Sequence, residues 1–133
     1  MAYGAEFTKN GFNAMVDKFF NAASTYTVPS QFKIGTGTTT PSQLDSDLET
    51  PITAWSGGTD FKDYNLTPVI DTANQKVTTQ SYIASTEANG NTITEYGEFN
   101  TDGTPLMISR AVFIGITKTS AVQAFIITTY KRV

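Results

Sequence analysis

The stretch that decides the fold runs from Ile93 to Val133 and reads ITEYGEFNTDGTPLMISRAVFIGITKTSAVQAFIITTYKRV. It holds three segments rich in β-branched and aromatic residues, 93–99, 106–113 and 122–130, and polar turns separate them. Such segments favour strands, and the Asp-Gly dipeptide between the first two is typical of a tight hairpin turn. The sequence therefore predicts three consecutive antiparallel strands at the centre of a sheet.

Further strands are predicted upstream of this stretch. Residues 76–85 are rich in β-branched residues, and the Asn-Gly dipeptide that follows them predicts a hairpin into the strand at 92–99. Residues 31–35 alternate in polarity as a short strand does, and residues 52–55 fit an edge strand. Four strands in sequence, arranged as a meander or Greek key, indicate a mainly β fold: an antiparallel β-sandwich or flattened barrel in a single domain, residues 1–133.

The first 25 residues contain a predicted amphipathic helix, from Thr8 to Ala23. Large apolar side chains recur on one stripe of this helix at spacings of three and four. Two interpretations remain open. Either the helix packs on the sheet or closes the end of a barrel, or its phenylalanines dock into a neighbouring subunit as a helix does in an apolar groove. The stripe consists of Phe12, Val16, Phe19 and Phe20, with Ala23 at its end.

A second, short helix is predicted from Pro41 to about Leu48. Thr40 and Gln43 stand three residues apart in the pattern of a capping box, and Pro41 suits the first helical position. The preceding loop, GTGTTT, lacks the lysine of a phosphate-binding loop. The acidic residues that follow lack the glycine of a calcium loop, so we interpret them as a solvated helix face.

Composition excludes several classes of function. The chain has neither cysteine nor histidine, which removes thiol nucleophiles, imidazole acid–base chemistry and the usual zinc ligands. Its net charge of −3 offers no basic patch for nucleic acid, and no apolar run is long enough to span a membrane. Glu6, Lys9 and Asn10 interrupt any signal-peptide core. We therefore expect no enzyme, no cofactor and no metal site.

Four charged residues lead to individual predictions. Glu95 and Glu98 are three apart on a predicted strand and so face opposite sides unless Gly97 forms a bulge, and no acid–base pair follows. Arg110 lies among apolar residues and needs a carboxylate partner, for which Glu95 or Glu98 is the natural choice. A partly exposed pair within the chain is favoured over a bridge between subunits. Lys118 is predicted to be a turn residue with a solvated amine.

Two stretches carry a resemblance to a known family. They are FKIGTGTTTPS, residues 32–42, and ITEYGEFNTDG, residues 93–103, the second continued by SRAVF and ITKTS. Together they resemble small virion proteins of tailed bacteriophages, the group that includes tail-fibre attachment, baseplate and collar proteins. The chain departs from the family pattern at Glu98, where an apolar residue is common, and in its polar C-terminal end. The resemblance implies assembly rather than catalysis.

The function expected from this resemblance is that of a structural component of a phage particle, in the tail, neck, collar or baseplate. The protein would be made in the bacterial cytoplasm, enter the virion, contact other virion proteins and form a homo-oligomer. A capsid decoration protein is one alternative. A receptor- or carbohydrate-binding module is another; it would use Trp55, otherwise a core or rim residue, and the tyrosines Tyr26, Tyr64, Tyr82 and Tyr96. Candidate interface residues are Phe12, Val16, Phe19, Phe20, Trp55, Arg110 and Tyr130.

Overall fold

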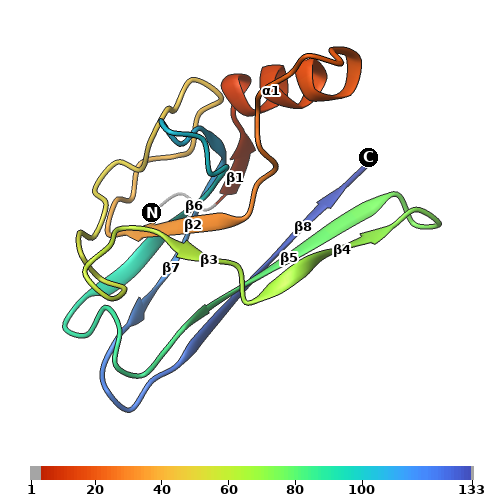
Figure 1. Ribbon diagram of the computed structural model, residues 1–133. Coiled ribbons are helices and arrows are strands. Elements are labelled where there is room, and N and C mark those ends of the chain that lie inside the picture. The colour runs from red at the N-terminus through yellow and green to blue at the C-terminus, as the bar shows by residue number, and fades with distance from the viewer. Residues whose placement is uncertain (1–3, 133) are drawn as a thin grey trace.

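In the computed structural model, which describes residues 4–132, the chain forms two antiparallel sheets and, within that range, one helix (Figure 1). This confirms the mainly β class, the sandwich-like arrangement and the N-terminal helix. Residues 1–3 of the predicted N-terminal region, and Val133, lie outside the described residues. In chain order the elements are β1 (Gly4–Phe7), α1 (Lys9–Phe20), β2 (Gln31–Gly35), β3 (Lys62–Asp63), β4 (Leu66–Asp71), β5 (Lys76–Ile83), β6 (Thr92–Phe99), β7 (Met107–Thr117) and β8 (Ala124–Lys131).

The strands are divided between the sheets in an order that the sequence did not reveal. The first sheet has the order β1-β7-β6-β2-β3, and the second has the order β4-β5-β8. β6 and β7 form the predicted hairpin, but β5 pairs with β8 over eight residues rather than with β6. The predicted hairpin across Asn89-Gly90 and the predicted run of three neighbouring strands are therefore wrong. The Asn-Gly signal does mark a turn, since Gly90 has a φ of 87°, but the turn leads from one sheet into the other.

Two connections, 84–91 and 118–123, run side by side where the chain crosses between the sheets. The backbone N–H of Gly90 donates to the carbonyl of Lys118 at 2.9 Å, and the Lys118 N–H donates to Asn91 at 2.8 Å. The Lys118 side chain is fully buried, and its ammonium donates to Ser85 O, Asn89 Oδ1 and Thr119 O. The prediction of a solvated amine is therefore wrong. Burial lowers the pKa of Lys118, and the three acceptors supply the hydrogen bonds that a buried ammonium requires.

Helix α1 packs on the first sheet through its smallest residues. Gly11 and Ala14 are its buried positions, and a Cβ added at Gly11 would lie 2.6 Å from the carbonyl oxygen of Ile108 in β7. Thr8 caps the helix by accepting a hydrogen bond from the Gly11 N–H at 2.9 Å. Because the small residues face the sheet, the stripe of large apolar side chains faces outward. The helix therefore packs on the chain's own sheet, as one of the two interpretations has it, but through Gly11 and Ala14 and not through the stripe.

The predicted second helix, from Pro41 to Leu48, is not formed, and this segment is irregular with a turn at 43–44. The Asp45 carboxylate accepts from the Ser42 N–H at 2.9 Å and from Arg110 Nη1 at 3.0 Å, so it holds this segment in its turn against β7. The carbonyl of Gln43, the proposed capping-box residue, instead accepts from the N–H of Lys9. The predicted edge strand at 52–55 is also absent, and only a single bridge joins Pro51 to Gly35.

The main core lies between the two sheets. It joins aromatic and aliphatic residues from β2, β5, β6 and β8 with Trp55 from the long β2–β3 connection, and Trp55 is only 6% exposed. A second, smaller cluster lies under the 36–50 segment and consists of Leu48, Phe99 and Met107, with Phe61 at its border. The 36–50 segment is therefore held against the first sheet by apolar contacts as well as by the charged residues described next.

Candidate functional site

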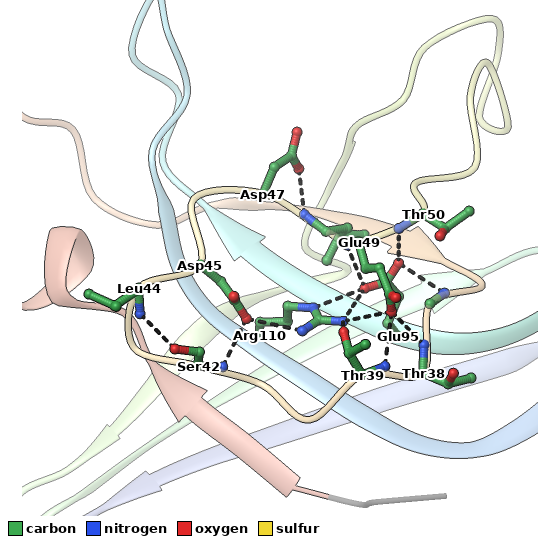
Figure 2. A network of polar contacts seen from close by, with 12 residues as sticks. Thr38, Thr39, Ser42, Leu44, Asp45, Asp47, Glu49, Thr50, Glu95 and Arg110 are labelled. Carbon is green, nitrogen blue, oxygen red and sulfur yellow. Dashed lines mark hydrogen bonds and ion pairs between the residues drawn. The ribbon is translucent and has the colours of Figure 1, made fainter.

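Arg110 and Glu95 form the centre of a buried charge network beneath the 36–50 segment (Figure 2). Arg110 comes from β7 and is 2% exposed, and Glu95 comes from β6 and is fully buried. The Arg110 Nε donates to Glu95 Oε2 at 2.9 Å, and Nη2 lies 2.9 Å from the same oxygen. Nη1 donates to Asp45 Oδ2 at 3.0 Å, and Glu49 Oε2 lies 3.6 Å from Nη2. We call Arg110, Glu95, Asp45 and Glu49 the Arg110 hub.

Glu95 also holds the backbone of the segment above it. Its two carboxylate oxygens accept hydrogen bonds from three backbone N–H groups, those of Gly37, Glu49 and Thr50, at 2.7 to 3.0 Å. These contacts, together with those of Arg110, satisfy a carboxylate that burial would otherwise destabilise. Every carboxylate of the hub bonds to Arg110 or to a backbone amide. The hub therefore fastens the 36–50 segment to β6 and β7 and leaves no free acid or base.

Arg110 stays charged in this setting. Burial disfavours its cation, but the hydrogen bonds to Asp45 and Glu95 outweigh burial and raise the pKa of Arg110. Glu95 is one of the two partners that the sequence predicted, and the pair lies within the chain as favoured. The alternative partner Glu98 and the expectation of partial exposure are both wrong. Arg110 is opposite Gly97 in the β6–β7 ladder, so its side chain lies on the Glu95 face of the sheet.

Glycines in the GTGTTT segment leave room for the hub. A Cβ added at Gly35 would lie 2.3 Å from Glu95 Oε1 and 2.6 Å from the carbonyl oxygen of Thr50. At Gly37 it would lie 2.6 Å from Glu49 Oε2 and 2.7 Å from Glu95 Oε1. Neither glycine has a positive φ, so the requirement is space and not backbone conformation.

Replacing Gly35 with alanine is expected to lower the free energy of unfolding by about 1–3 kcal/mol, because the new methyl group overlaps a fixed carboxylate and a backbone carbonyl. Gly103→Ala is the matched control, since no atom lies within 4 Å of the added Cβ there. It should stay within about 0.5 kcal/mol of the wild type. Urea unfolding followed by the fluorescence of Trp55 measures both, and equal midpoints for the two variants would show that the hub does not occupy this space.

Glu98 lies on the opposite face of β6 and forms a second buried network, between the two sheets. Its carboxylate accepts from the hydroxyls of Tyr64 and Tyr130 at 2.7 Å, Thr79 at 2.6 Å and Tyr96 at 3.0 Å. Thr79 and Tyr130 belong to the second sheet, so this cluster joins the two layers. The opposite faces predicted for Glu95 and Glu98 are confirmed, and the two carboxylates have separate partners.

The three tyrosines of this Glu98 cluster are held in the neutral form. Burial, followed by the negative charge of Glu98, raises the pKa of Tyr64, Tyr96 and Tyr130. All four hydroxyls donate to one carboxylate, so the cluster is satisfied internally and has no free group directed to solvent. We interpret it as the polar contact that fixes how the two sheets face each other.

Exposed apolar side chains mark the surfaces available to a neighbour. On α1 the exposed fractions are 53% for Phe12, 52% for Met15, 37% for Val16, 81% for Phe19 and 80% for Phe20. Monomeric proteins seldom expose such contiguous apolar patches. We call these five residues the α1 patch. A second group lies on the strands of the second sheet: Leu66, Val69, Ile70, Phe125 and Ile127.

The structure separates the predicted interface residues into two groups. Phe12, Val16, Phe19 and Phe20 are on the surface. Trp55 and Arg110 are in the interior, and the Tyr130 hydroxyl bonds to Glu98 and Ser109. Trp55 and Tyr96 are buried, so neither contributes to the exposed aromatic surface that a carbohydrate-binding module would need. Sequence reasoning missed Met15 and the exposed residues of the second sheet, although the alternation Phe125, Ile127, Thr129 is the signal of one strand face.

Comparisons of the chain with protein-family models, with curated proteins and with solved structures found no match. Within residues 4–132, the helix is too short to cross a membrane. In the same part of the chain, no group of three or more acidic side chains is placed to hold a metal ion.

Proposed function

We propose that this protein is a structural subunit of a tailed-bacteriophage particle, held in the tail, neck, collar or baseplate by contacts with other virion proteins. The observation that carries the proposal is the α1 patch, five large apolar side chains on a twelve-residue helix that the chain's own sheet does not cover. Exposed apolar surface of this kind is stabilised by burial against a partner.

The residues behind the family resemblance support the same role. The stretch 32–42 and the stretch 93–103 with its SRAVF continuation meet in one place, the Arg110 hub. Together they hold a long irregular segment in one conformation on the first sheet. A shape fixed in this way suits a subunit that must present the same surface in every copy, and every charged group of the hub is engaged in that task.

Replacing Phe19 with aspartate tests the proposal, since a charge at the most exposed position of the α1 patch should prevent its burial against a neighbour. Asn13→Asp is the matched control, because it adds the same charge at another exposed position of the same helix. We expect the wild-type protein and the Asn13 variant to be present in phage particles purified from a culture that carries the gene. The amount of the Phe19 variant in these particles should be lower by a factor of at least roughly ten.

Immunoblotting and mass spectrometry of the purified particles give the readout, and thermal unfolding of each isolated variant shows that the fold is intact. Absence of the wild-type chain from the particles would contradict the proposal. Equal incorporation of the Phe19 and Asn13 variants would show that the α1 patch is not the contact.

A further inference from the structure

The two sheets have four edges, and three of them are protected against pairing with another strand. β1 is four residues long and β3 only two. β4 carries Pro68, and its register shifts between Leu66 and Val69. Short strands, prolines and irregular register are the features by which proteins prevent edge-to-edge association.

The fourth edge, β8, has none of these features. It is eight residues long, reads AFIITTYK, and pairs with β5 without interruption from Ala124 to Lys131. Within residues 4–132 it has no other strand neighbour. Every second residue of such an edge directs its backbone N–H and C=O away from the sheet, where another strand can bind them. Lys131 is its one charged residue, at the very end.

We infer that β8 is the self-association edge of this protein, and that it pairs with β8 of a second copy in antiparallel orientation about a two-fold axis. The paired second sheets would then form one continuous six-stranded sheet in the order β4-β5-β8-β8-β5-β4. This inference rests on the proposed role in assembly and names its partner as the same chain.

The side-chain pattern of β8 is its own complement in this orientation. Phe125, Ile127 and Thr129 lie on the outer face, and residues directly opposite in a sheet share a face. With the axis at Ile127, this residue faces its own copy and Phe125 faces Thr129. Aromatic, aliphatic and β-branched residues thus meet across the new pair, which is the composition that stabilises antiparallel strands.

Charge decides between the antiparallel and parallel arrangements. In a parallel pair Lys131 would lie beside Lys131 of the second copy, and each is already opposite Lys76 within its own sheet. Like charges directly opposite each other destabilise a sheet. In the antiparallel pair the two Lys131 residues are eight positions apart along the strand, roughly 27 Å at 3.4 Å per residue. The antiparallel pair therefore avoids the repulsion.

Ile127→Lys tests the inference in the isolated full-length protein. It places two like charges at the axis, and we expect the dissociation constant for self-association to rise at least about tenfold. Ile114→Lys is the matched control, an isoleucine of β7 with a similar exposed fraction, 71% against 64%, and we expect less than about a twofold change. Analytical ultracentrifugation over a concentration series measures both constants.

Two further variants make the test specific for pairing of like with like. Mixing the Ile127→Lys protein with an Ile127→Glu protein should restore the dimer, because opposite charges then meet at the axis. Since the chain has no cysteine, Ile127→Cys supplies a single thiol, and mild oxidation should link two copies. Opposed residues of an antiparallel pair have Cα atoms about 4.5–5.5 Å apart, within disulfide range. The control variant Ile114→Cys should not link.

A wild-type protein that stays monomeric at millimolar concentration would overturn the inference, as would a dimer that Ile127→Lys leaves unchanged or a mixture that fails to restore it. Cross-linking of the Ile127→Cys variant to a different protein in particles would also overturn it and assign the edge to that partner. These outcomes are separate from the test of the proposed function: a chain present in particles but monomeric in solution contradicts the β8 pairing alone.

Discussion

Replacing Glu95 with alanine is expected to lower the free energy of unfolding by about 3–5 kcal/mol, the usual cost of leaving a buried charge without its partner. The variant loses two contacts to the Arg110 guanidinium and three backbone hydrogen bonds. The remaining partners of Arg110, Asp45 and Glu49, are partly exposed and contribute less. Because small domains are stable by only about 5–15 kcal/mol, this variant should lose a substantial part of its stability.

Trp55 gives the readout, since it is the single tryptophan and lies in the main core. Urea unfolding followed by its fluorescence should show the lower midpoint. Glu49→Ala is the matched control: it removes a carboxylate of the same hub at a partly exposed position, and we expect a much smaller loss of stability. A Glu95 variant as stable as the Glu49 variant would show that the hub is not the main fastener of the 36–50 segment.

Five of the strands were predictable because their signal is local, whereas β1, β3 and β4 were not predicted. The β-branched and aromatic segments coincide with β5, β6, β7 and β8, and β2 was found from its alternation. Which strands pair was not predictable from local signals, because the choice of β8 over β6 as the partner of β5 depends on contacts between distant residues. The corner that separates the sheets is fixed by burial of Lys118, and a polar Lys-Thr-Ser segment gives no sign of that burial.

The helix shows how a correct pattern can be assigned to the wrong face. Its apolar stripe was identified, but Gly11 and Ala14 decide which side meets β7, because only small residues allow so close an approach. The same reasoning explains the Arg110 hub. Glu95 could be named as a partner since it is near Arg110 along the hairpin, whereas Asp45 and Glu49 belong to a segment whose path depends on the hub itself.

The Glu98 cluster predicts that the free energy of unfolding falls steeply as the pH rises above about 10. Tyr64, Tyr96 and Tyr130 ionise with a pKa near 10.0 when unfolded, and burial beside Glu98 raises the pKa of each in the folded chain. A raised folded pKa stabilises the protein fully below the unfolded pKa, and this contribution is lost as pH rises above it. Each tyrosine should therefore remove about 1.4 kcal/mol per pH unit above pH 10, or about 4 kcal/mol per unit for the three.

Lys118 acts in the opposite direction over a limited range. Its folded pKa is lowered from 10.5, so deprotonation favours the folded state as pH rises toward 10.5 and has no further effect beyond it. The full slope should therefore appear above about pH 10.5. Urea midpoints measured from pH 9 to 11.5, with tyrosinate absorbance recorded alongside Trp55 fluorescence, give the slope.

Tyr64→Phe removes one of the three titrating groups and should lower the alkaline slope by about one third, to about 2.7 kcal/mol per pH unit, whatever it does to stability at neutral pH. Tyr82→Phe is the matched control, because the Tyr82 hydroxyl bonds to exposed Gln123 and takes no part in the Glu98 cluster. In the wild type, the three tyrosines of the Glu98 cluster should ionise only together with the loss of folded Trp55 fluorescence. If all tyrosines ionise while that fluorescence is unchanged, the three hydroxyls are not held between the sheets by Glu98, and the two layers must be joined by their apolar contacts alone.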